Sequence, residues 1–107
     1  MKRASKYKRR PRDLHYMAWI RRQPCAARAL TEGLAHTCDG SVEADHAGRR
    51  CVGQKAEDRT CIPLCSHHHA QRASFHGVFK SWNQAKMRAW LTALVLKYQL
   101  MYDLEHQ

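Results

Sequence analysis

The chain lacks a long apolar segment. Its most apolar stretch, WLTALVL at residues 90–96, is interrupted at Lys97 and falls well short of the roughly 18 residues that indicate a membrane-spanning helix. The basic N-terminus is not followed by the apolar core that a signal peptide carries. We therefore expect a cytoplasmic protein that is neither inserted in a membrane nor secreted.

Acidic residues are also scarce, with 9 Asp and Glu against 19 Lys and Arg and a formal net charge of +10. This balance favours an anionic partner, first of all nucleic acid, with a membrane surface as the weaker option. Residues 1–12 hold seven basic residues and no acid, which predicts a flexible arm. This arm either binds DNA, through Lys8, Arg9 and Arg10 among others, or only keeps the protein in solution. The length of 107 residues then leaves a single domain over residues 13–107 with a modest core.

The cysteines are odd in number and include no C-x-x-C pair. Five cysteines in a reducing cytoplasm favour metal binding over disulfides. The densest group of donors is CIPLCSHHH at residues 61–69. Within it, Cys65 and His68 form C-x-x-H at the start of an expected helix, a spacing that suits one half of a tetrahedral zinc site.

The other half of such a zinc site must come from elsewhere in the chain. Cys25 and Cys38 lie before the first expected strand and are the natural candidates. The predicted structural zinc ligands are Cys25, Cys38, Cys65 and His68. The alternatives are a free buried thiol at Cys25 or Cys38, or a site completed by Cys51 or Cys61. We expect Cys61 in the core, because its surroundings are apolar, and Cys51 in a basic loop.

Hydrophobic periodicity and turn residues predict a mixed α+β chain. The expected elements are a helix over residues 13–23, strands over 41–45 and 60–64, a helix from Ser66 and a helix over 82–104. Asp13 is a plausible N-cap, and Pro24 should end the first helix. Ser81 and Gln84 indicate a capping box at the start of the last helix, and Gly77 interrupts the pattern before it.

The last helix carries an apolar stripe that Leu96 and Leu100 widen. Its members are Met87, Trp90, Leu91, Leu94, Tyr98 and Met101. We expect this face to dock on the protein's own core. The alternative is an interface with a second copy of the chain or with another protein.

EADH at residues 43–46 places an acid and a histidine side by side at the end of the first expected strand. Neighbouring strand residues point to opposite faces, but twist at a strand end can turn both toward one cleft. Asp45 could then hold a hard divalent ion, and His46 could take a proton from water. His69 and His76 lie seven apart, so two helical turns would bring both to one face and let them converge with Asp45.

The pieces GSVEADHAG, RRCVGQKAEDRTCIPLCSHHH and FHG, followed by a helix, occur in this order along the chain. This combination resembles the HNH or ββα-metal nucleases, particularly a short branch common in phages and prophages, over about residues 14–95. The resemblance implies a small ββα-metal core with an N-terminal helix and a long C-terminal helix, stabilised by zinc. It also implies hydrolysis of DNA phosphodiester bonds by a phage- or prophage-encoded protein in a bacterial cell.

The resemblance further implies a role for each motif residue. His46 matches the general base, while Asp45, His69 and His76 match the ligands of one catalytic divalent ion, Mg²⁺ or Mn²⁺. Cys65 and His68 match the second half of a structural Zn²⁺ knuckle. The loop residues that would clamp substrate phosphates are Arg49, Arg50 and Lys55.

Two departures from the family pattern separate the possible functions. The middle Asn of the HNH motif is missing: Thr60 lies nearest the expected place and Asp58 two residues earlier. The first zinc knuckle is reduced to Cys25, which leaves Cys38 as the inferred replacement. The leading hypothesis is a metal-dependent HNH endonuclease. The second is a non-catalytic, zinc-stabilised DNA-binding protein, and the third is a partner-dependent protein that docks through its C-terminal helix.

Overall fold

The computed structural model describes residues 12–31, 38–48 and 57–107. Outside these ranges lie most of the predicted basic arm and the predicted phosphate-binding residues Lys8, Arg9, Arg10, Arg49, Arg50 and Lys55, as well as Cys51.

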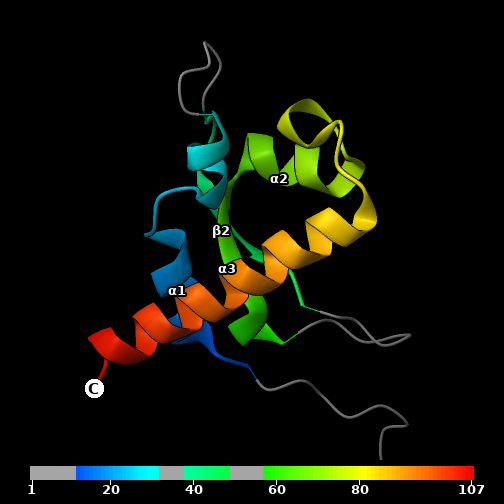
Figure 1. The fold of residues 1–107 in the computed structure, drawn as a ribbon. Helices are drawn as coiled ribbons and strands as arrows, with labels where there is room; N and C mark the ends of the chain where they lie inside the picture. Colours follow the sequence, from blue (N-terminus) through cyan, green and yellow to red (C-terminus); the bar gives the residue numbers. More distant parts are fainter. Residues whose placement is uncertain (1–11, 32–37, 49–56) are drawn as a thin grey trace, which may run out of the picture.

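The described residues form an α+β fold in which helices pack on one two-stranded sheet (Figure 1). The helices are α1 (Leu14–Arg21), α2 (Ser66–Ser74) and α3 (Gln84–Glu105); the short 3-10 helices are η1 (Ala26–Thr31), η2 (Asp58–Thr60) and η3 (Gly77–Phe79); the strands are β1 (Val42–His46) and β2 (Cys61–Cys65). The predicted α+β class, with an N-terminal helix and a long C-terminal helix, is confirmed. None of the helices in the described ranges is long and apolar enough to cross a bilayer.

The strands β1 and β2 pair antiparallel, with Val42 opposite Cys65 and His46 opposite Cys61. Each lies one residue further along the chain than predicted. Every residue of β2 is buried, which explains its continuous apolar sequence. Pro63 is accommodated because each strand of a two-stranded sheet has one edge without ladder hydrogen bonds. This register places the end of β1 beside η2, which precedes β2.

The helix α2 follows β2 with no intervening residue. Cys65 ends the strand and also caps the helix, because its Sγ accepts a hydrogen bond from the backbone N–H of His68 at 3.4 Å. The backbone N–H of Ser66 donates to the carbonyl of Ser41 at 3.0 Å, which ties the first turn of α2 to the start of β1. The helix ends at Ser74, where Phe75 adopts a left-handed conformation with φ of 54°.

Helix caps confirm one prediction and correct another. The carboxylate of Asp13 accepts a hydrogen bond from the backbone N–H of Tyr16 at 3.0 Å, so Asp13 caps α1 as expected. The predicted capping box at Ser81 is wrong. The cap of α3 is Asn83, whose side-chain oxygen accepts from the backbone N–H of Lys86 at 2.8 Å, because an Asn there reaches the same orphan amides that a Ser cap would serve.

The long helix α3 lies across α1 and β2 (Figure 1), with Met87, Leu91 and Tyr98 buried against them. The remaining stripe residues pack partly against this core. Docking of the stripe on the protein's own core is therefore confirmed. Leu96 and Leu100, which widen the stripe, are instead 62% and 61% exposed.

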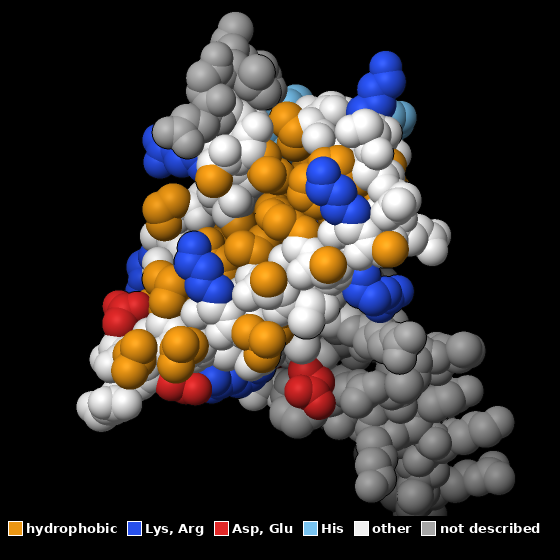
Figure 2. Space-filling model, viewed as in Figure 1, with side chains coloured by type: hydrophobic (Ala, Val, Ile, Leu, Met, Phe, Trp, Pro, Cys, Tyr) orange, Lys and Arg blue, Asp and Glu red, His pale blue; other side chains and the backbone are white. Residues whose placement is uncertain are grey.

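Aromatic side chains close the space between α2 and α3. Phe79 is fully buried, with ring centroids of Trp82 and Trp90 at 5.0 and 5.3 Å. The Nζ of Lys86 lies 4.6 Å from the centroid of the Trp82 ring, a cation–π distance. Figure 2 shows hydrophobic side chains gathered on this face between α2 and α3, with basic side chains across them.

Candidate metal centre and histidine–carboxylate cluster

Four predicted zinc ligands come together at the corner where β2 meets α2. Cys65 and His68 come from this corner, Cys25 follows α1, and Cys38 precedes β1. The four donor atoms all lie within 4.8 Å of one another. The Nδ1 of His68 is 3.1 Å from the Sγ of Cys65 and 3.6 Å from that of Cys25.

These distances suit a tetrahedral zinc site. With Zn–S bonds of about 2.3 Å and Zn–N bonds of about 2.0–2.1 Å, neighbouring sulfur and nitrogen ligands lie about 3.5 Å apart. Cys25, Cys65 and His68 are buried, Cys38 is half-buried, and all three thiols are free rather than joined in disulfides. The group could therefore hold a structural metal such as zinc. Cys61 is fully buried in the core and lies outside the group, as predicted.

The thiols of the group differ in the direction in which their pKa is shifted. Burial raises the pKa of Cys25, and it raises the pKa of Cys38 to about 12. Burial acts in the same direction on Cys65, but hydrogen bonds from the backbone N–H of His68 and from the Asp39 backbone outweigh it and lower the pKa of this thiol. Cys65 is therefore the readiest thiolate. A bound metal would make all three thiols release their protons.

The end of β1 carries the second cluster. The carboxylate of Asp45 is almost fully buried, and its Oδ1 lies 3.3 Å from the Nε2 of His69 on α2. Arg72, one helical turn further along α2, donates from both Nε and Nη2 to this carboxylate. The structure thus brings Asp45 and His69 together as predicted, and it adds an arginine that sequence reasoning did not identify.

A second acid fixes the ring of His69. The Oε1 of Glu43 accepts a hydrogen bond from the Nδ1 of His69 at 2.7 Å. In the neutral ring, Nε2 then carries a lone pair and faces an oxygen of Asp45, which is also an acceptor. Two facing acceptors at 3.3 Å need a proton or a cation between them. The same Oδ1 also accepts a hydrogen bond from the Nη2 of Arg72 at 2.7 Å, so one positive charge already faces this oxygen.

His46 points to a different partner. Its Nε2 lies 2.9 Å from the Oδ1 of Asp58, which is only 5% exposed. The other oxygen of Asp58 accepts from the Nε of Arg12 at 3.0 Å and from the backbone N–H of Asp13 at 2.9 Å. Burial alone would raise the pKa of Asp58, but hydrogen bonds from His46 and Asp13 outweigh it and lower the pKa. An ionised carboxylate only accepts, so His46 donates from Nε2 and keeps Nδ1 for other chemistry.

Asp58 is therefore the hydrogen-bond partner of His46, a contact that sequence reasoning did not predict. The antiparallel register contains the signal, because it sets the end of β1 beside the residues that precede β2. Thr60, the other candidate for the missing Asn position, donates its hydroxyl to the carbonyl of Glu57 at 2.6 Å.

His76 does not join Asp45 and His69. The helical face expected to connect His69 to His76 is not formed, because α2 ends at Ser74. The side chain of His76 is exposed, with its Nδ1 2.9 Å from the hydroxyl of Ser74. Within residues 12–31, 38–48 and 57–107, the Cys₃His set is the only group of three or more donors with metal-ligand spacing.

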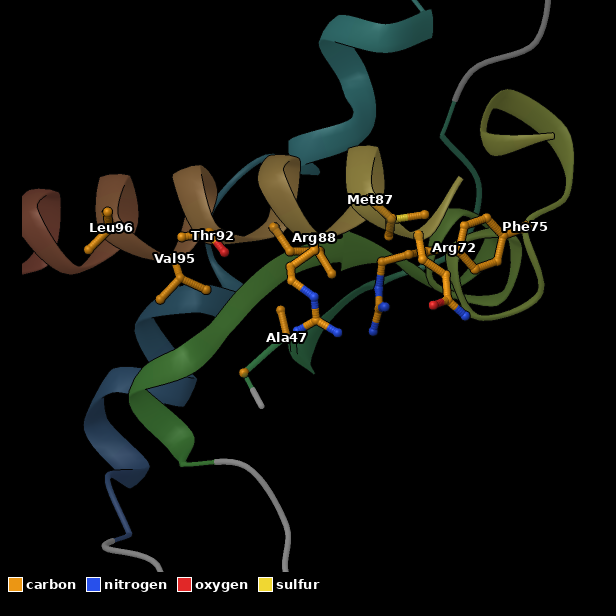
Figure 3. A pocket seen from close by; sticks show the side chains of 11 residues that line it. Ala47, Arg72, Phe75, Met87, Arg88, Thr92, Val95 and Leu96 are labelled. Carbon is orange, nitrogen blue, oxygen red and sulfur yellow. The ribbon is translucent and has the colours of Figure 1, made fainter. Parts of the chain in front are cut away.

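A groove of about 870 Å³ opens beside this cluster, between the end of β1, α2 and α3. Its walls combine the arginines Arg72 and Arg88 with mostly apolar side chains, and Ala47 and Gly48 form the side nearest β1. Figure 3 shows the guanidinium groups of Arg72 and Arg88 side by side and pointing the same way, with Phe75 near one end of the groove and Leu96 near the other.

Comparisons of the chain with protein-family models, with curated proteins and with solved structures gave no match.

Proposed function

We propose that the protein is a metal-dependent endonuclease of HNH type that hydrolyses DNA phosphodiester bonds on a zinc-stabilised ββα unit. One observation carries the proposal: β1 ends in Asp45 and His46, β2 leads directly into α2, and this helix sets the Nε2 of His69 3.3 Å from the Oδ1 of Asp45. The formal net charge of +10 supports a polyanionic substrate.

His46 is the proposed general base. Its Nε2–H is held by Asp58, so the ring orientation and the tautomer are fixed, and Nδ1 is left to accept a proton from the attacking water. The imidazolium that forms is stabilised by the ionised Asp58. Asp58 thereby takes over the orienting task for which the sequence offers no Asn.

Asp45 and His69 are the residues that would hold a catalytic Mg²⁺ or Mn²⁺. When bound, such an ion supplies positive charge to the phosphate and to the departing oxygen. Glu43 orients His69 through Nδ1, the carboxylate–histidine arrangement that commonly supports a metal ligand. Two protein ligands are consistent with Mg²⁺, which usually keeps several waters and also binds substrate phosphates.

The Cys₃His group has a structural part in this proposal. It would join the segment after α1 and the segment before β1 to the corner between β2 and α2. His68 is a ligand of this group, and the next residue is His69. A zinc ion here would therefore fix the helix turn on which the alignment of His69 with Asp45 depends.

The second candidate function is a non-catalytic, zinc-stabilised DNA-binding protein. The observation that favours it is the pair of hydrogen bonds from Arg72 to Asp45, which neutralises the carboxylate that the divalent ion would need. In that case, the Cys₃His group and the net positive charge still serve DNA binding, whereas His46 has no proton to transfer.

Plasmid cleavage distinguishes the two functions. The zinc-loaded protein is incubated with supercoiled DNA and Mg²⁺ or Mn²⁺, beside the His46→Ala variant and a reaction without added divalent ion. Omission is preferable to a chelator, which would also remove zinc. His15→Ala is the matched control, because His15 is an exposed histidine on α1.

We expect nicking that requires the divalent ion and falls about 10²–10⁴-fold in His46→Ala, the usual contribution of a general base, and that persists in His15→Ala. If no variant cleaves with any divalent ion while salt-sensitive DNA binding is intact, the protein is the binding module. Cleavage that survives in His46→Ala would remove His46 from the mechanism.

A further inference from the structure

The groove beside the cluster has an apolar lining, for which binding to a duplex backbone offers no reason. A phosphodiester backbone seen from outside offers charge, and Arg72 and Arg88 match it. The other side chains that face the groove include Phe75, Met87 and Leu91, which are apolar and give a phosphate nothing to bind. A ligand that fills this groove therefore carries both an anion and an apolar part.

Arg88 is available to such a ligand. It is exposed on α3, and no acid in the described part of the chain pairs with it. Arg72 uses two of its N–H groups on Asp45, and a guanidinium has five. The two groups lie side by side in Figure 3, so a phosphate between them meets donors from two helices.

The apolar side chains identify the second part of the ligand. Phe75 closes α2 in a left-handed conformation, which fixes its backbone, and its ring lines the groove. Bases stack on aromatic rings of this kind when they are unpaired. Inside a duplex their faces are covered by neighbouring bases. The volume of about 870 Å³ is in the range of small-ligand sites, which suits one nucleotide.

We infer that the groove binds an unpaired nucleotide of a DNA strand, with its phosphate on Arg72 and Arg88 and its base against Phe75. This inference rests on the proposed function and names its substrate class: single-stranded DNA, or duplex DNA that is locally opened. Arg72 also donates a hydrogen bond to Asp45, which faces His69. A phosphate bound to Arg72 would therefore share this arginine with the cluster of Asp45 and His69.

The test measures binding separately from cleavage. The zinc-loaded full chain is titrated, with no Mg²⁺ or Mn²⁺ added, against a fluorescent single strand and against a duplex of the same sequence. The variants are Arg88→Gln and Phe75→Leu. Arg22→Gln is the matched control, because Arg22 is exposed at the end of α1 and does not line the groove.

We expect the single strand to bind more tightly than the duplex. Phe75→Leu should weaken binding of the single strand at least about fivefold, which is the lower end of the effect of one stacked base. The same variant should bind the duplex as tightly as the wild type does. Arg88→Gln should weaken binding of the single strand. It should also reduce the slope of log affinity against log salt concentration by about 0.7, the value for one phosphate contact on a single strand. The Arg22→Gln variant should still bind the single strand more tightly than the duplex.

Equal or tighter binding of the duplex, or equal effects of Phe75→Leu on both ligands, overturns the inference. The two proposals fail separately. Plasmid cleavage that depends on His46 but shows no strand preference refutes the groove assignment and leaves the nuclease intact. A strand preference that depends on Phe75 and Arg88, without cleavage in any metal, supports the groove and refutes the nuclease.

Discussion

Removal of the ion from the Cys₃His group should unfold the protein. A structural zinc contributes about 10–16 kcal/mol of apparent binding free energy at pH 7. A natural domain unfolds with only about 5–15 kcal/mol in total. Here the ion would join three separate stretches of chain, and three of its four ligands are buried. We expect no cooperative thermal transition in the zinc-free chain and recovery of the transition when one equivalent of zinc is added.

Elemental analysis and circular dichroism test this expectation together. The wild type should bind one zinc per chain, and Cys38→Ala should lose both the zinc and the cooperative transition. Cys61→Ala is the matched control: it deletes a buried thiol outside the group and should keep one zinc while losing only about 1 kcal/mol. A chain that binds no zinc, or whose melting is indifferent to added zinc, would refute the assignment of a structural metal to this group.

The same group predicts the pH dependence of zinc binding. Burial raises the pKa of Cys25 and Cys38, so both thiols are protonated near pH 7 and each releases a proton to the solvent on binding. The apparent zinc affinity should therefore rise by at least about two log units per pH unit between about pH 6.5 and 8. Competition with a chromogenic chelator measures this slope, and a slope below one would mean that these thiols are not ligands.

Three further predictions concern the cluster and the core. Asp58→Asn should slow plasmid cleavage about 10²–10⁴-fold at unchanged zinc content, because His46 loses the anion that fixes its tautomer; an unaltered rate would contradict this role. The lowered pKa of Asp58 contributes stability that is present above about pH 4 and is lost as pH falls through the folded value, so the urea midpoints of wild type and Asp58→Asn should converge in acid. Leu91→Ala, at a buried position of α3, should cost about 2–5 kcal/mol of unfolding free energy, whereas Leu100→Ala should change it by less than about 0.5; equal costs would mean that Leu100 is covered in solution.

The features that could be predicted are mainly those that depend on residues close together along the chain. Both strands lie within one residue of their predicted ranges, because the residues on either side of each strand interrupt its apolar pattern. Asp13 was found as a cap since it directly precedes an amphipathic segment. The Cys₃His group could be predicted because the cysteine count is odd, which favours metal binding over disulfides, and because Cys65 and His68 lie at ligand spacing.

The remaining contacts depend on pairing between distant segments. The hydrogen bond from His46 to Asp58 needs the antiparallel register, and the contact of Arg72 with Asp45 needs the position of α2 on the sheet. The geometry expected for His76 failed for a local reason: Phe75 adopts a left-handed conformation, which no periodicity in the sequence announces. The cap at Asn83 was missed because Ser81, two residues earlier, offers similar chemistry.

No loop separates β2 from α2, because the strand ends at Cys65 and the helix begins at Ser66. Cys65 is at once the last residue of the strand, the cap of the helix and a member of the metal group. A loop would absorb an inserted residue, but an insertion after Cys65 would rotate every later residue of α2 by about 100° about the helix axis. His69 and Arg72 would then both turn away from Asp45 while β2 itself stayed intact. An inserted residue at this corner would therefore separate the Cys₃His group from the contacts of His69 and Arg72 with Asp45.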